Sequence, residues 1–90
     1  MKRKECEIKN KLGLHARPAS LVVKLAGKYT SEIELIKEDT EVNAKSILGV
    51  MMLAAGPGQR ITITAEGPDE VEAVDALAAL IDSGFGEELA

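Results

Sequence analysis

The sequence predicts an α+β fold, an open-faced sandwich in which a four-stranded antiparallel sheet is covered on one face by three helices. Two observations carry this prediction. Three short segments alternate apolar and polar residues, as half-buried strands do, with a fourth, shorter strand after a polar turn, and three other segments repeat apolar residues at helical spacing. The order along the chain is β-α-β-β-α-β-α, and its central strand pair reads as a hairpin, which excludes a purely parallel sheet.

Four strands are predicted, and all but the short third one direct alternate apolar residues to one side. They cover Lys4–Lys9, Glu32–Leu35, Thr40–Asn43 and Arg60–Ala65. A polar turn over Lys37–Asp39 joins the second strand to the third, which predicts an antiparallel hairpin. Cys6, the only cysteine, alternates with Glu5 and Glu7, so we expect it to face the core. A lone cysteine cannot form an internal disulfide and cannot by itself build a metal site.

The first predicted helix runs from Ala16 to Ala26. Pro18 suits its first turn, where a missing N–H costs nothing, and Gly27 marks its end. Residues three or four apart lie on one face of a helix. This spacing predicts a polar stripe of Arg17, Ser20, Lys24 and Lys28, with Ala19, Val22, Val23 and Ala26 turned to the core.

Two further helices follow. The middle one begins after Ser46, a good N-cap residue, and its apolar run extends to Gly56. The last one has Asp69 as a capping residue with Glu72 three positions later, and Gly84 is placed to end it. Its expected core-facing stripe consists of Val71, Val74, Ala78 and Ile81.

Length and composition limit the possible functions. Ninety residues, 46% hydrophobic and 29% charged, predict one globular domain over residues 1–90. No apolar run is long enough to span a membrane, and the start MKRKECEIKN is not followed by the apolar block of a signal peptide. We therefore expect a cytoplasmic protein without membrane insertion.

Charge is unevenly distributed. Residues 1–28 contain eight Lys and Arg against two acidic residues, whereas the remainder contains three against thirteen. This asymmetry predicts an anionic ligand or an acidic protein partner near the N-terminal segment. The acidic remainder, with one Tyr, one Phe and no Trp in the whole chain, argues against nucleic-acid binding.

The segment GLHARPAS contains the only histidine, His15, directly before the first predicted helix. The unpaired N–H groups and the positive dipole end of a helix start attract an anion, and Arg17 adds a guanidinium two residues later. An imidazole is largely neutral and nucleophilic near neutral pH. Attack by His15 on a phosphoryl group would therefore leave the new phosphate beside groups that stabilise it.

Three segments, GLHARPAS, NAKSILGVMML and GQRITITAEGPDE, closely resemble HPr, the histidine-containing phosphocarrier family of the bacterial phosphoenolpyruvate-dependent sugar phosphotransferase system. The resemblance covers nearly the whole chain and implies the HPr-like fold. It implies that phosphorylated enzyme I phosphorylates His15 on Nδ1 and that sugar-specific IIA domains remove the phosphate. It further implies that Arg17 and the amides of Ala16 and Arg17 hold the phosphate and that Pro18 fixes the helix start. A carrier of this kind is no enzyme and needs no cofactor or metal of its own.

The resemblance also implies a regulatory site and a docking surface. In many relatives an ATP-dependent HPr kinase/phosphorylase phosphorylates the serine that corresponds to Ser46, which lowers phosphotransfer and in some bacteria promotes binding to a catabolite control protein. Capping alone would also explain a serine there. Ile47, Leu48 and Met51 share one helix stripe and match the family's exposed patch, which Ser20 and Lys24 complete. A helix apolar on all sides is usually buried, so burial of the patch stays open.

Three other functions remain as alternatives. NKLGLHARPAS and SGFGEE also resemble the nitrogen-related paralogue of HPr, which carries phosphate toward regulation. A regulatory binding module that depends on Ser46 is the second, although relatives of that kind lack the histidine. An independent hydrolase is the weakest, because one histidine without a cysteine or second base nearby forms no triad.

The loop Ala54–Gln59 lacks the basic residue found in many relatives.

Overall fold

The computed structural model describes residues 1–90 and contains a four-stranded sheet with three helices. Its strands are β1 (Lys2–Glu7), β2 (Glu32–Lys37), β3 (Thr40–Asn43) and β4 (Arg60–Glu66). Its helices are α1 (Ala16–Ala26), α2 (Ile47–Met52) and α3 (Glu70–Asp82), followed by the short 3₁₀ turn η1 (Gly84–Gly86). The predicted order and fold class are therefore confirmed.

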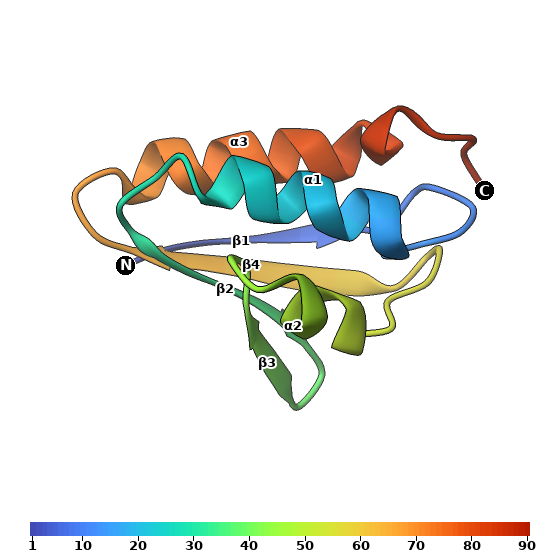
Figure 1. Cartoon of the computed structure of the whole chain (residues 1–90), viewed down its shortest axis with the longest axis horizontal. Coiled ribbons are helices and arrows are strands. Elements are labelled where there is room, and N and C mark those ends of the chain that lie inside the picture. Colours follow the sequence, from blue (N-terminus) through green and yellow to red (C-terminus); the bar gives the residue numbers. More distant parts are fainter.

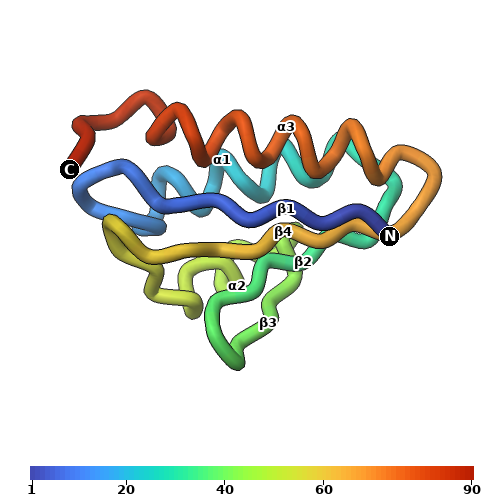
Figure 2. Tube along the Cα trace, turned by 180° about the vertical axis from the view of Figure 1, so that it is seen from behind, coloured from blue at the N-terminus to red at the C-terminus, as the bar shows by residue number.

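The sheet has the strand order β1-β4-β2-β3, and every neighbouring pair is antiparallel. β1 and β3 are thus the two edge strands. Figure 1 shows α1 and α3 side by side over one face of the sheet, with the shorter α2 beside the start of α1. The view from behind shows β1 and β4 in front of the faint α1 and α2, with no helix covering the two strands on that side (Figure 2). This arrangement is the open-faced sandwich predicted from the sequence.

The core lies between the sheet and the helices. In β4, Ile61 pairs with the buried Cys6 of β1, and Ile63 and Ala65 pair with the buried Leu35 and Ile33 of β2. All three β4 residues are at most 1% exposed. Cys6 is buried at 8% exposure, as its alternation predicted. Burial also raises the pKa of its thiol, because a low-dielectric environment disfavours the thiolate.

Two strand boundaries differ from the prediction. β1 spans Lys2–Glu7 instead of Lys4–Lys9, because its ladder with β4 pairs Lys2 with Ala65 and ends at Glu7 opposite Arg60. Ile8 remains fully buried beyond the strand. β2 continues two residues further, to Lys37, because Ile36 and Lys37 pair with β3. Alternation identified the buried residues, whereas the partner strand decided the length.

The middle helix is shorter than predicted and ends at Met52 instead of continuing to Gly56. The amides of Leu53 and Ala54 bond to carbonyls three residues earlier, and Ala54 adopts a left-handed conformation at φ 49°. Pro57 further disfavours helical backbone at Gly56. The predicted cap is confirmed, since Ser46 Oγ accepts a hydrogen bond from the Gly49 amide at 3.1 Å.

The last helix is capped differently from the prediction. Asp69 occupies the N-cap position but makes no side-chain cap, and Glu72 forms no capping box. The Asp69 carboxylate instead reaches across to Thr30 and Ser31, while Glu70 accepts the Gly67 amide at 3.2 Å. Val71 was expected in the core and is 46% exposed, because the buried face turns toward Val74, Ala78 and Ile81. Gly84 follows the helix with φ +71°, as its predicted role requires.

None of these helices combines the length and the apolar character that crossing a membrane requires.

Candidate functional site

His15 is the N-cap residue of α1. Its backbone is extended, at φ −78° and ψ −171°, and its carbonyl accepts the Ala19 amide at 3.0 Å as the first bond of the helix. The imidazole makes no capping hydrogen bond. The ring is therefore placed at the helix start without being used to stabilise it, and 37% of its surface is exposed.

The first turn of α1 leaves two donors free. The amides of Ala16 and Arg17 make none of the backbone or side-chain hydrogen bonds in the structure. Pro18 follows in the first turn, where its missing N–H leaves no donor unpaired, and its side chain is buried. Two free N–H groups and the positive end of the helix dipole thus lie directly beside His15.

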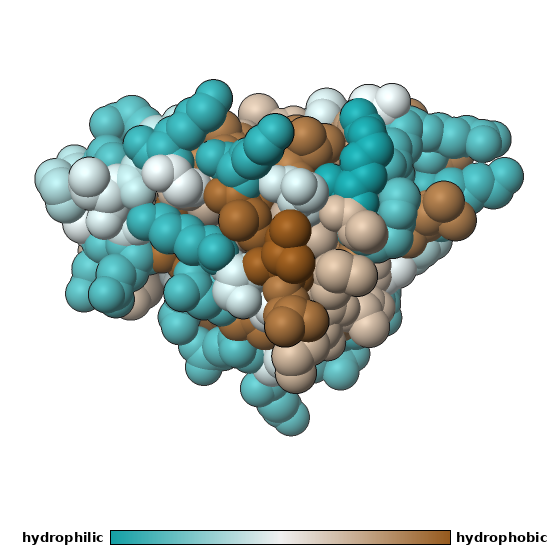
Figure 3. All heavy atoms as spheres, viewed as in Figure 1, coloured by the Kyte–Doolittle hydropathy of each residue, from teal (hydrophilic) through white to brown (hydrophobic).

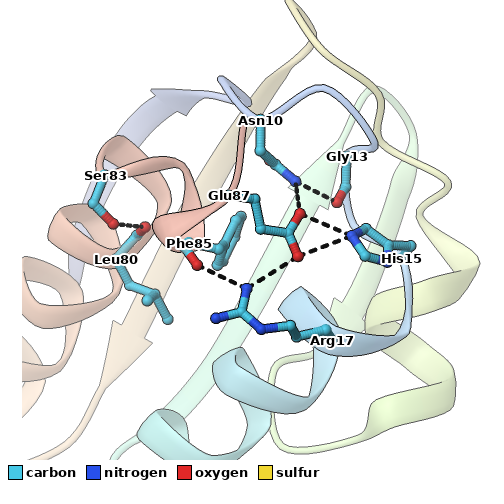
Figure 4. A network of polar contacts seen from close by, with 8 residues as sticks. All are labelled: Asn10, Gly13, His15, Arg17, Leu80, Ser83, Phe85 and Glu87. Atoms are coloured by element: carbon cyan, nitrogen blue, oxygen red, sulfur yellow. Dashed lines mark hydrogen bonds and ion pairs between the residues drawn. The ribbon is translucent and has the colours of Figure 1, made fainter. Parts of the chain in front are cut away.

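A carboxylate from the C-terminal segment completes this site (Figure 4). Glu87 approaches His15 Nε2 with its Oε1 at 2.8 Å and its Oε2 at 3.1 Å. Arg17 Nη1 donates to Glu87 Oε2 at 3.0 Å and to the Phe85 carbonyl at 2.9 Å. Asn10 Nδ2 donates to Glu87 Oε1 at 3.0 Å. The carboxylate therefore holds the nucleophile candidate and the guanidinium together.

These contacts keep the Glu87 carboxylate ionised. The pKa of Glu87 lies below its usual range, because hydrogen bonds from His15, Asn10 and Arg17 favour the charged carboxylate against the opposing effect of desolvation. The Glu87 side chain is only 16% exposed, so it stays ionised while largely shielded from solvent. In the structure, His15 Nδ1 and the remaining guanidinium nitrogens of Arg17 have no hydrogen-bond partner.

Glu87 and Asn10 were missed by the sequence analysis. The segment after α3 folds back along the loop before α1, where the Lys11 amide bonds to the Glu88 carbonyl at 2.8 Å and the Ala90 amide to the Lys9 carbonyl at 2.9 Å. The glycines on both sides of Phe85 signalled a turn, and the following acids matched the basic N-terminal segment in charge. Neither signal specifies which glutamate reaches His15.

The apolar patch on α2 is exposed, which resolves the alternative left by the sequence. The exposed fractions are 44% for Ile47, 72% for Leu48 and 40% for Met51, while Val50 and Leu53 are buried. Met52, absent from the predicted patch, adds a further 73% exposed side chain. Apolar side chains gather over α2 on this face, below the polar side chains of α1 (Figure 3).

The remaining predicted residues lie on α1 and at the α2 cap. Ser20 is half-buried and Lys24 is exposed, on the polar side of α1. α1 packs against α2, which brings the polar stripe and the apolar patch onto neighbouring surfaces. Ser46 is half-buried and takes no part in the His15 network. No group of three or more His, Cys, Asp and Glu side chains is arranged to hold a metal ion.

Comparisons with known proteins agree with this geometry. Residues 2–83 match the PTS-HPr family, described as the PTS HPr component phosphorylation site. The chain is 51% identical over 87 residues to the phosphocarrier protein HPr of Cupriavidus necator. The matched segment covers 97% of this chain and 98% of that protein. It is 52% identical over 82 residues to the HPr-like protein Crh of Halalkalibacterium halodurans, covering 91% and 98%. A crystal structure of HPr from Thermoanaerobacter tengcongensis superposes with a TM-score of 0.94 at 54% identity, covering 99% and 100%.

Proposed function

This chain belongs to the HPr family of phosphocarrier proteins, which are carriers and not enzymes, and from that premise we propose that it accepts a phosphoryl group on His15 from phosphorylated enzyme I and passes it to sugar-specific IIA domains. The observation that carries the proposal is the position of the imidazole, partly exposed at a helix start beside two free amides. The proposal places the protein in the cytoplasm, where it would meet these partners.

The geometry supports a simple transfer step. His15 Nδ1 attacks phosphorus, the bond from phosphorus to the donor breaks, and the electron pair of that bond leaves with the donor. The amides of Ala16 and Arg17 and the free nitrogens of the Arg17 guanidinium stabilise the phosphate oxygens. The same donors hold the phosphate until an acceptor approaches. Transfer onward reverses the step, so the protein ends each cycle unchanged.

The test is phosphorylation of the intact protein. It is incubated with enzyme I, phosphoenolpyruvate and magnesium, and its mass is measured before and after exposure to acid, with His15→Ala treated in parallel. We expect one acid-labile phosphate on the wild type and none on His15→Ala. If enzyme I phosphorylates a known carrier but leaves this protein unmodified, the phosphocarrier function is wrong.

We further propose that the α2 patch and the polar side of α1 form one docking surface for enzyme I and the IIA domains. Its residues are Ser20, Lys24, Ile47, Leu48 and Met51. An exposed apolar centre beside a basic rim suits brief binding to an acidic partner. Leu48→Ala should raise the KM for phosphoryl acceptance, whereas Val71→Ala, an exposed apolar residue on α3, should not. Equal KM values would contradict this surface.

Regulation at Ser46 is a second candidate function, and the similarity to Crh favours it. A second Crh relative, from Bacillus subtilis, is 46% identical over 81 residues, and its solution structure is described as that of the catabolite repression HPr. We propose that an HPr kinase/phosphorylase phosphorylates Ser46 and that a catabolite control protein then binds. The phosphate would lie on the N-terminus of α2 and add negative charge beside the docking surface.

Ser46→Asp and Ser46→Ala separate regulation from capping. Aspartate also caps helices well, so we expect Ser46→Asp to keep stability but to slow phosphoryl acceptance from enzyme I. Ser46→Ala removes the bond to the Gly49 amide and should cost about 1 kcal/mol of unfolding free energy without slowing acceptance. Incubation with ATP and an HPr kinase should add an acid-stable phosphate to the wild type only. Acceptance by Ser46→Asp at the wild-type rate would contradict regulation by charge.

A further inference from the structure

Glu87 contacts the proposed nucleophile from the C-terminal segment, beyond the residues that the family model matches. That match ends at residue 83, and Glu87 lies in the segment that folds back over the start of α1. The residues before it turn the chain sharply, with φ of +71° at Gly84, +59° at Phe85 and +71° at Gly86. A positive φ is unfavourable for phenylalanine, so this conformation is maintained by its surroundings. Phe85 is 2% exposed and its carbonyl accepts the Arg17 guanidinium.

Contacts of Asn10, on the loop before α1, also hold this turn in place. Asn10 is fully buried, and its Nδ2 donates both to the Gly13 carbonyl at 2.8 Å and to Glu87 Oε1 at 3.0 Å. Asn10 also pairs with Leu89 as an isolated antiparallel bridge. Backbone pairing, a buried amide and a buried ring therefore all position one carboxylate, and that carboxylate lies at His15 Nε2.

The contact determines where the imidazole keeps its hydrogen. An ionised carboxylate can only accept hydrogen bonds, and the pKa of Glu87 is lowered, so Nε2 must be the donor. In the neutral ring the hydrogen is then on Nε2 and the lone pair on Nδ1. Since Nδ1 has no hydrogen-bond partner, its lone pair is available for bonding to phosphorus. A carboxylate orients the histidine of a Ser-His-Asp triad in the same way.

We propose that Glu87 is a positioning residue for the phosphoryl transfer at His15, an inference that rests on the proposed function. Its carboxylate keeps the hydrogen on Nε2, which makes Nδ1 the nucleophile. As the bond from Nδ1 to phosphorus forms and the bond from phosphorus to the donor breaks, the hydrogen stays on Nε2 and the ring becomes positively charged. The negative charge of Glu87, 2.8 Å from Nε2, stabilises that ring.

A carboxylate that merely fastened the C-terminal segment would not need to touch the imidazole. The backbone bonds of Lys11 and Ala90 already fasten that segment, and both belong to neighbours of Glu87 and not to Glu87 itself. The next residue, Glu88, offers the matched control. It has the same side chain on the same segment, 78% exposed, and its nearest cation is Lys11 Nζ at 3.5 Å.

The experiment compares Glu87→Gln, Glu87→Asp and Glu88→Gln with the wild type. Ring ¹⁵N shifts of His15 report which nitrogen carries the hydrogen, and single-turnover phosphorylation by enzyme I and phosphoenolpyruvate reports the rate. We expect Glu87→Gln to lose the preference for Nε2–H and to accept phosphate about 10- to 100-fold more slowly, as when the carboxylate behind a ligating histidine is removed. Glu87→Asp should recover part of both effects, and Glu88→Gln should behave as the wild type.

Hydrogen exchange at the Lys11 amide shows whether the C-terminal segment stays docked, because that amide bonds to the Glu88 carbonyl. A slower Glu87→Gln with an unchanged His15 tautomer would overturn the positioning role and leave only a fastening role. An equally fast Glu87→Gln would overturn it as well, with the phosphocarrier function intact. If the wild type itself accepts no phosphate from active enzyme I, the proposed function fails first and this role fails with it.

Discussion

At each end of α1, a carboxylate from the last quarter of the chain accepts hydrogen bonds from residues at or just beyond the helix terminus. At the start of α1, Glu87 binds His15, Arg17 and Asn10. Beyond its end, Asp69 accepts hydrogen bonds from the Thr30 amide at 2.8 Å, the Ser31 amide at 2.9 Å and Ser31 Oγ at 2.5 Å. Figure 1 shows these two ends on opposite sides of the molecule.

The two carboxylates differ in the kind of group that donates hydrogen bonds to them. The main partners of Asp69 are backbone amides and a hydroxyl, which do not titrate, and they lower its pKa from 3.8 to about 2, chiefly through the Ser31 hydroxyl. The partners of Glu87 include the imidazole that is proposed to carry the phosphate on Nδ1 and a guanidinium whose free nitrogens can bind that phosphate. The same acid group therefore joins two segments at one end and holds a reactive side chain at the other.

The largest effect is expected at the reactive end. Arg17→Ala should slow phosphoryl acceptance by about 10²- to 10³-fold, the usual loss when one charged or oriented donor to a developing oxyanion is removed. Its unfolding midpoint should hardly change, because 56% of the side chain is exposed. Single-turnover kinetics and urea denaturation measure the two properties, with Lys28→Ala, an exposed cation just beyond the far end of the helix, as the control. An unchanged rate would show that the guanidinium does not stabilise the phosphate.

At the other end of α1, near Asp69 and Ser31, a substitution should change the stability of the protein but not its phosphoryl acceptance. Gly67 has φ +152°, and a Cβ there would lie 2.7 Å from the Ser31 Cα. Gly67→Ala should therefore lower the unfolding free energy by about 1–3 kcal/mol. Gly56→Ala is the control, because its Cβ would meet only Gln59 Oε1 at 3.9 Å. Equal stability of the two variants would contradict the close approach at Ser31, and the folded part of Gly67→Ala should still accept phosphate normally.

Acid should remove the contribution that the ionised Asp69 carboxylate makes to the stability of the fold. The folded-state pKa of Asp69 is depressed to about 2, so its contribution is fully present above the unfolded value near 3.8 and disappears as the pH falls from there toward 2. Asp69→Asn should be less stable than the wild type at pH 7 and should lose less stability across that interval. Thermal unfolding followed by circular dichroism from pH 2 to 7 tests this. Parallel curves for the two proteins would contradict it.

The smallest effect concerns one hydrogen bond at the same end. Ser31→Ala removes the hydroxyl that bonds to Asp69 and should cost about 1 kcal/mol of unfolding free energy. Thr30→Ala is the matched control, because the Thr30 Oγ lies 3.4 Å from Asp69 and its residue is exposed, so the change should stay within about 0.5 kcal/mol. If Thr30→Ala costs as much as Ser31→Ala, the hydroxyl of Ser31 is not the main partner.

The sequence by itself determined the order of elements, the inward residues of the strands and the helix start that presents His15. These features follow from local rules, since alternation and helical periodicity depend only on near neighbours. The bounds of α1 and the cap at Ser46 were predicted correctly because Pro18, Gly27 and Ser46 act within one helical turn. The family resemblance added the chemical role proposed for His15 and Arg17.

Only the tertiary structure decided the strand order β1-β4-β2-β3, the partner of Asp69 and the place of Glu87. Asp69 looked like a helix cap because its type and spacing fit one, yet Ser31 lies 38 residues away and provides better donors. Glu87 reaches His15 across 72 positions, through a turn stabilised by burial of Phe85 and pairing with the Lys9–Lys11 loop. Such contacts depend on how distant segments pack, and a local pattern carries no information about distant partners.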